Sequence, residues 1–140
     1  MLRTRTMCAA VGFLLLVAAC GDDSTGPNED RLLGSWQLAT FEANGTPYSL
    51  DVVGDVPGQW HFFPDGTGMG LEWWDGELRT EPWFFDWRTE GNQLFFRDEG
   101  DTEWEGSITY SATSTKLTVS YQDDVGDDIY DFELTYSRMN

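Results

Sequence analysis

The stretch KLTVSYQDDVGDDIYDFELTYSR, residues 116–138, has the most regular pattern in the chain. Two runs in it alternate between apolar and polar residues, and their apolar members are Leu117, Val119 and Tyr121, then Tyr130, Phe132, Leu134 and Tyr136. Successive side chains of a strand point to opposite faces of the sheet, so each run predicts a strand with one buried and one solvated face. The acidic segment 123–128 between the runs predicts a hairpin turn.

Similar short runs recur from Leu32 onward, with turn signals at intervals of about eight to twelve residues and no helical period. The strongest turn signals are Pro64-Asp65-Gly66 and Asp75-Gly76. Segments 90–92 and 111–115 are expected to close further hairpins. The pattern predicts an all-β domain of about eight strands. They are expected at 34–42, 58–63, 67–74, 78–88, 93–98, 103–111, 116–122 and 128–138.

Short connections between consecutive strands favour an up-and-down antiparallel meander. Such a sheet must curl into a barrel or leave its edge strands exposed, and we expect a barrel. The first connection is the exception, because residues 44–57 have no clear strand pattern.

Aromatic residues stand side by side in EPWFFDWRTEGNQLFF, residues 81–96. The face without charges is expected to point inward, which leaves Phe84 outside, and Phe95 is assigned to the outside in the same way. Outward rings either form cross-strand pairs that stabilise the sheet or make a surface platform for a glycan or an envelope protein. The residues expected to line the interior, as core or as ligand contacts, are Trp83, Phe85, Trp87, Tyr121, Tyr130 and Phe132.

The first nineteen residues have the features of an export signal, with Arg3 and Arg5 before an apolar stretch at 9–19. The run Val17-Ala18-Ala19-Cys20 resembles the cleavage site of bacterial lipoproteins. That resemblance implies cleavage before Cys20 and acylation of this cysteine, so that the protein is bound to a membrane by its lipid chains. Two or more acyl chains give stable anchoring.

Residues 20–31 are polar and read as a flexible acidic tether between the anchor and a domain at 32–140. By resemblance to lipoprotein sorting rules, Gly21 argues against retention in the inner membrane. The expected location is therefore the bacterial cell envelope, at the outer membrane, on its periplasmic side or at the cell surface. Cys8 lies in the signal and Cys20 is the expected anchor, so no disulfide is expected in the domain.

Several short motifs occur in a recognisable order: Leu33-Gly34-Ser35-Trp36, Asn44-Gly45, residues 63–68, Leu117-Thr118-Val119, and Arg138 near the end. Together they resemble the lipocalin-like domain of small bacterial lipoproteins, over nearly all of residues 32–138. The resemblance implies a barrel that binds a small apolar ligand, with Trp36 near the barrel floor and Arg138 crossing its ring. The central Thr-Asp-Tyr motif of true lipocalins has no counterpart here.

Charge excludes one class of partner. Arg3 and Arg5 lie in the signal, so the remaining chain has six basic and twenty-five acidic residues and a net charge of −19. Nucleic-acid binding requires clusters of Lys and Arg, and none exists.

Catalytic residues are scarce. The domain has no cysteine and no Gly-x-Ser-x-Gly motif, and its one histidine, His61, stands between two aromatic residues of a predicted strand. We therefore expect a non-catalytic protein without a cofactor.

Calcium is the one metal that the acidic turns suggest. The candidate ligands are Asp123, Asp124, Asp127 and Asp128, and the run 98–101 is a second candidate. Neither has the ligand spacing of an EF-hand, so solvated acidic turns are the expected meaning.

Overall fold

The computed structural model of the protein describes residues 29–140. The predicted signal at 1–19, the proposed lipidation site Cys20 and most of the tether lie outside the described residues. Among residues 29–140, no helix has the length and apolar character needed to cross a membrane.

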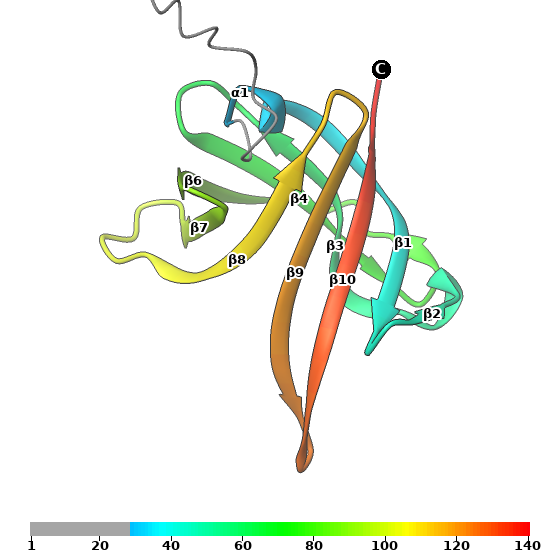
Figure 1. The fold of residues 1–140 in the computed structure, drawn as a ribbon. Helices are drawn as coiled ribbons and strands as arrows, with labels where there is room; N and C mark the ends of the chain where they lie inside the picture. The colour runs from blue at the N-terminus through cyan, green and yellow to red at the C-terminus, as the bar shows by residue number, and fades with distance from the viewer. Residues whose placement is uncertain (1–28) are drawn as a thin grey trace, which may run out of the picture.

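Eight strands form a closed antiparallel barrel, in which each strand pairs with the next and the last pairs with the first (Figure 1). They are β1 (Gly34–Ala43), β3 (Gly54–Phe62), β4 (Thr67–Trp74), β6 (Trp83–Glu90), β7 (Gln93–Asp98), β8 (Glu105–Ala112), β9 (Lys116–Val125) and β10 (Asp128–Arg138). Two short strands, β2 (Thr46–Tyr48) and β5 (Glu77–Leu78), extend the sheet beside β1 and β4. The helical parts are α1 (Glu29–Leu32) and the 3-10 turn η1 (Leu50–Val52). The predicted all-β meander and its closure into a barrel are confirmed.

Several strand boundaries differ from the prediction. The expected strand 78–88 is two strands, β5 and β6, separated by a segment that includes Pro82, which cannot donate a backbone hydrogen bond. β3 begins at Gly54 and not at 58, and β-bulges interrupt its first residues. β9 continues to Val125, so the turn before β10 is only residues 126–127. The unpatterned stretch 44–57 contains β2 and η1, which the sequence analysis missed.

The aromatic residues of β6 pack over glycines of the neighbouring strand. In the register of β4 and β6, Gly68 lies opposite Phe85 and Gly70 lies opposite Trp83. A Cβ atom at Gly68 would overlap the Phe85 ring, and one at Gly70 would overlap the Trp83 ring. The missing side chains on β4 thus make room inside the barrel for the large rings of β6.

Trp60 is the centre of the aromatic core. Its ring centroid lies 4.8 Å from that of Phe96, 5.3 Å from that of Phe62 and 5.5 Å from that of Phe85. Edge-to-face and offset contacts of this kind stabilise a core beyond the area they bury. Phe62 and Phe85 are each only 1% exposed, so this part of the interior is densely filled.

The two ends of the barrel are formed by different segments (Figure 1). The closed end contains α1, the C-terminus and the turns 63–66, 91–92 and 113–115. The open end is formed by the connections 44–53, 75–82, 99–104 and 126–127. The hairpin of β9 and β10 projects beyond the other strands at the open end.

Candidate ligand-binding site

The closed end is sealed by Trp36 and Arg138, which are partners in the β1–β10 register. Trp36 is fully buried, and its Nε1 donates a hydrogen bond to the Leu32 carbonyl at 2.8 Å. The guanidinium carbon of Arg138 lies 4.2 Å from the Trp36 ring centroid, inside the range of a cation–π contact. The guanidinium also donates to three backbone carbonyls, those of Arg31 (2.6 Å), Leu33 (2.7 Å) and Ser114 (2.7 Å). The structure therefore brings together the two residues expected at the barrel floor.

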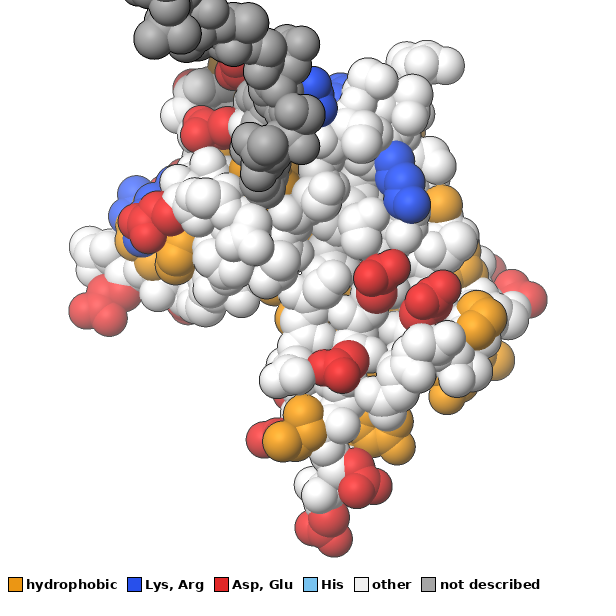
Figure 2. Space-filling view, in the orientation of Figure 1, with side chains coloured by type: hydrophobic (Ala, Val, Ile, Leu, Met, Phe, Trp, Pro, Cys, Tyr) orange, Lys and Arg blue, Asp and Glu red, His pale blue; other side chains and the backbone are white. Residues whose placement is uncertain are grey.

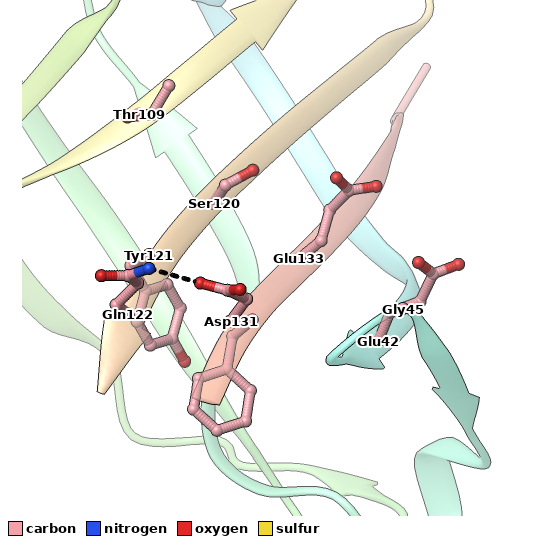
Figure 3. A pocket seen from close by; sticks show the side chains of 9 residues that line it. Glu42, Gly45, Thr109, Ser120, Tyr121, Gln122, Asp131 and Glu133 are labelled. Atoms are coloured by element: carbon pink, nitrogen blue, oxygen red, sulfur yellow. Dashed lines mark hydrogen bonds between the residues drawn. The ribbon is translucent and has the colours of Figure 1, made fainter. Parts of the chain in front are cut away.

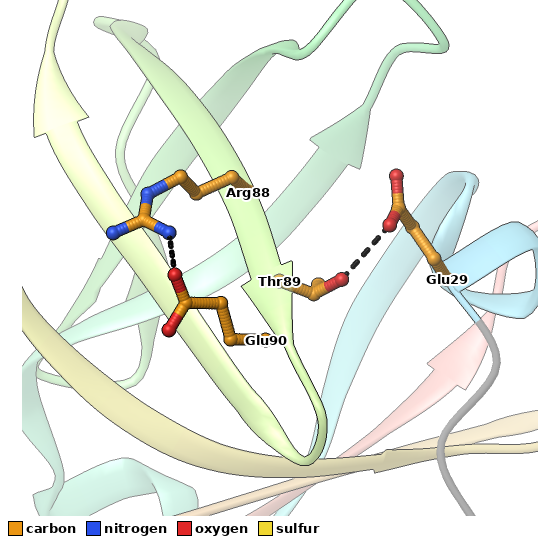
Figure 4. Close-up of polar contacts among 4 residues, drawn as sticks. All are labelled: Glu29, Arg88, Thr89 and Glu90. Carbon is orange, nitrogen blue, oxygen red and sulfur yellow. Dashed lines mark hydrogen bonds and ion pairs between the residues drawn. The ribbon is translucent and has the colours of Figure 1, made fainter.

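Helix α1 is also tied to the closed end through β6 (Figure 4). The Thr89 hydroxyl donates to the Glu29 carboxylate at 2.9 Å. On the opposite face of the same strand, Arg88 pairs with Glu90. The segment before β1 is thus held against the barrel by side-chain contacts as well as by the Trp36 hydrogen bond.

A cavity of about 220 Å³ lies in the barrel interior, toward the open end. Its wall is almost entirely apolar and consists of Pro57, Trp60, Phe96, Ile108, Val119, Tyr121, Leu134 and Tyr136. Apolar cavities of about 150 Å³ in other proteins stay dry and take up benzene. This space is therefore large enough for a ligand of one or two rings.

The polar atoms beside the cavity are not available to a ligand. The Tyr136 hydroxyl donates to the Pro57 carbonyl at 2.8 Å. Burial raises the pKa of Tyr136, and the nearby Trp60 indole partly opposes this rise, so the hydroxyl stays neutral at physiological pH. The Trp60 Nε1 has no hydrogen-bond partner, but packed atoms cover it completely. Tyr136 and Trp60 therefore offer a ligand no hydrogen bond, and the wall would hold it mainly by apolar contacts.

Aromatic residues continue from the cavity along the inward faces of β9 and β10. Phe132 lies 5.3 Å from Tyr121 and 6.0 Å from Tyr130, measured between ring centroids. Burial raises the pKa of the Tyr121 hydroxyl, and the carboxylates of Asp123 and Asp55 raise it further. The open end is thus both aromatic and negatively charged where Tyr121 meets the cavity.

The six residues expected in the interior have different environments. Phe85 and Trp87 are core residues, 1% and 4% exposed, and Trp83 is half-buried over β4. Tyr121 is the member of the six that lines the cavity, while Tyr130 and Phe132 are half-buried beside it.

Trp60 was not recognised as a wall residue. Its signal was the alternation of Val56, Gly58, Trp60 and Phe62, which are all buried. The expected strand began at 58, so it left out Val56, the first residue of this pattern.

The outward rings do not form the continuous patch that the sequence suggested. Phe84 is 50% exposed and shares a hollow of about 250 Å³ with Phe63, which is 45% exposed. Phe95 is half-buried under the guanidinium of Arg88, 4.3 Å from its ring centroid. Phe84 and Phe95 therefore belong to separate parts of the outer surface.

A larger hollow of about 350 Å³ lies on the outer surface of β8, β9, β10 and β1 (Figure 3). Ser120, Glu133 and Glu42 follow one another across the last three of these strands. Gln122 donates to the Asp131 carboxylate at 2.6 Å. These side chains are polar and mostly solvated, so this hollow does not provide the apolar enclosure found in the interior.

The structure places the predicted calcium ligands on different elements. Asp123 and Asp124 lie in β9, where they face opposite sides, Asp127 lies in the turn, and Asp128 begins β10. Within residues 29–140, the acidic trio whose carboxylate oxygens lie within 4.8 Å of one another is Asp98, Asp101 and Glu105. All three are exposed, and exposed acidic groups often cluster without an ion.

His61 lies on the outer face of β3, where its Nδ1 is 2.6 Å from the Ser35 hydroxyl of β1. Partial burial lowers its pKa. The contact links two neighbouring strands outside the cavity, which fits a structural role.

The structure is thus a closed antiparallel β-barrel with one sealed end and an apolar cavity toward the other. The model of the lipocalin-like domain family matches residues 32–140, so the chain belongs to that family. Comparisons with the curated proteins and with the solved structures gave no significant match.

Proposed function

We propose that the protein is a non-catalytic, lipid-anchored binding protein of the bacterial envelope that holds a small apolar ligand in its interior cavity. The observation that carries this proposal is the cavity of about 220 Å³ with its apolar wall. Membership of the lipocalin-like family supports it, because such barrels suit the binding of small ligands.

The energetics of packing also support a binding role. A hollow of about 220 Å³ leaves wall residues such as Ile108 and Tyr121 with fewer packing partners than a filled core would give them. The same barrel fills its closed half densely with aromatic rings. The contrast between this hollow and the filled closed half supports a ligand that occupies the space near the open end.

A pair of matched substitutions tests this role. Ile108→Trp places a ring in the cavity, whereas Ile129→Trp makes the same change at the hairpin tip, where Ile129 is 67% exposed. Calorimetric titration with neutral probes from benzene to naphthalene should show binding that Ile108→Trp abolishes and Ile129→Trp leaves intact. Equal binding by both variants would refute an interior site.

The lipid anchor has its own test. In cells, Cys20→Ser should move the protein from the membrane fraction to a soluble fraction. Unchanged membrane attachment would refute acylation at this residue. Because the chain reaches the barrel through α1 at the closed end, an anchor at Cys20 would leave the open end free to meet ligands away from the membrane.

A surface platform for a glycan or an envelope protein is the second candidate. It is favoured by the two exposed rings, Phe63 and Phe84, that share one outer hollow. Phe84→Ala should weaken binding of oligosaccharides in a glycan array and leave binding of the interior probes unchanged. Oligosaccharide binding that Phe84→Ala leaves unchanged, or no such binding by the parent protein, would refute the surface platform.

A further inference from the structure

The open end is strongly acidic. Its four connections contain Asp51, Asp75, Glu77, Glu81, Glu99, Asp101, Glu103 and Asp127. Arg79 is the one basic residue in these described connections, and it lines an outer hollow together with Glu72 and Glu81. On the face shown in Figure 2, acidic side chains gather toward the tip of the β9–β10 hairpin.

Two exposed carboxylates lie close in sequence to residues of the cavity wall. Asp123 follows Tyr121 by two residues on β9, so it continues the inward face on which Tyr121 lines the cavity. Its carboxylate accepts a hydrogen bond from the Asp124 backbone N–H at 2.9 Å. Asp55 lies in the bulge of β3, two residues before Pro57 of the cavity wall, with a φ of 59°. Burial raises the pKa of the Tyr121 hydroxyl and the two carboxylates raise it further, which is consistent with this placement.

Aromatic faces accompany these charges. In the β9–β10 register, Tyr130 lies opposite Asp123, and Phe132 lies opposite Tyr121. The Tyr130 and Phe132 rings are stacked with an interplanar angle of 18°. Ring faces attract cations and repel anions because of their quadrupole. Rings and carboxylates together therefore favour positive charge at this end of the cavity.

We propose that the ligand is a small hydrophobic amine or other organic cation, with its apolar body in the cavity and its charged head between the rings of Tyr121, Tyr130 and Phe132 and the carboxylates of Asp123 and Asp55. This inference rests on the proposed function. The cavity wall is almost entirely apolar, so the charged group of the ligand is placed at the open end. A carboxylate such as that of a fatty acid would meet two like charges there and is disfavoured.

Three probes that share one apolar body test the charge preference: 2-phenylethylamine, 2-phenylethanol and 3-phenylpropanoate. Titrations use the exported chain carrying Cys20→Ser, purified without detergent, at pH 7 and low salt. The amine should bind about tenfold more tightly than the alcohol, and the carboxylate most weakly. Added salt should weaken binding of the amine and leave that of the alcohol unchanged.

Matched variants test whether Asp123 and Asp55 cause the preference for a cationic ligand. Asp123→Asn and Asp55→Asn should each reduce the affinity for the amine about threefold without changing that for the alcohol. Asp124→Asn is the control, because its side chain faces the other side of β9. It should leave both affinities unchanged.

Each remaining outcome is informative. Equal binding of amine and alcohol would overturn the inference and leave the cavity as a site for neutral ligands. Amine binding that survives both Asp→Asn changes and Ile108→Trp would place the cation elsewhere on the acidic surface, which also overturns it. If none of the three probes binds, the proposed function itself fails.

Discussion

The closed and open ends of the barrel are made from the same strands but are finished in opposite ways. At the closed end, Leu32, Trp36, Leu94 and Leu117 are completely buried, and Arg138 satisfies three backbone carbonyls. At the open end, the interior is hollow, and Val52 and Ile129 are 70% and 67% exposed. From this difference we infer that the packing of the closed end supplies most of the stability of the barrel. The open end can therefore remain unfilled and available for binding.

Removing the Trp36 ring should have the largest effect. Trp36→Ala deletes a fully buried ring, its hydrogen bond to Leu32 and the surface on which Arg138 rests. We expect a loss of about 3 to 5 kcal/mol in the free energy of unfolding, measured by urea denaturation. Trp74→Ala at the open end, where the ring is 40% exposed, should cost less than about 1 kcal/mol. Similar losses at the two ends would break the comparison.

Arg138→Gln should have the next largest effect. The substitution removes the cation–π contact with Trp36 and leaves backbone carbonyls without their donor. We expect a loss of about 2 to 3 kcal/mol in the free energy of unfolding. Arg79→Gln, in the connection 75–82 at the open end, is the control and should change stability by less than about 0.5 kcal/mol. Equal stability of Arg138→Gln and the parent protein would show that the closed end does not depend on this arginine.

Substitution by a larger side chain should also destabilise the closed end more than the open end. Leu117→Trp forces a ring into filled space at the closed end and should cost about 1 to 3 kcal/mol of unfolding free energy. Ile108→Trp adds a ring to the cavity and should cost less than about 1 kcal/mol, because space exists for it. Thermal unfolding of the two variants measures the difference. A larger loss for Ile108→Trp would mean that the open end is as tightly packed as the closed end.

The sequence predicted the barrel because closure depends on signals that are local. Alternation of apolar and polar residues fixed the faces of β9 and β10, and the pattern around Trp83 fixed the face of β6. Trp36 and Arg138 could be paired in advance through the family resemblance. The alternation is contained within single strands, and the motifs that include Trp36 and Arg138 lie at the two ends of the domain.

The cavity could not be predicted because it depends on how side chains from many strands fill a common volume. Trp60 and Phe96 sit on strands that are far apart in sequence, and their contact at 4.8 Å between ring centroids has no local signature. The rings of β6 fill their half of the barrel only because β4 carries Gly68 and Gly70. Whether a volume stays empty depends on the sizes of side chains from several strands together. The alternation of apolar and polar residues shows only to which face of the sheet each side chain points.

The smallest expected effect is a change in the pH dependence of stability. It arises at His61, which lies on β3 near the closed end of the barrel. Burial lowers the pKa of His61, so the unfolded chain binds a proton more readily than the folded protein does. Stability is therefore highest above the unfolded pKa of about 6.5 and falls as the pH decreases through that value. Protonation also adds charge where the Nδ1 atom meets the Ser35 hydroxyl at 2.6 Å.

His61→Gln should remove this part of the pH dependence, because glutamine does not titrate. Urea denaturation between about pH 7.5 and 5.5 should show a smaller decrease in stability for the variant than for the parent protein. All other titratable groups are common to the two proteins, so the difference between the two profiles reports on residue 61. Identical pH profiles would mean that the contact between β1 and β3 does not depend on the protonation of His61.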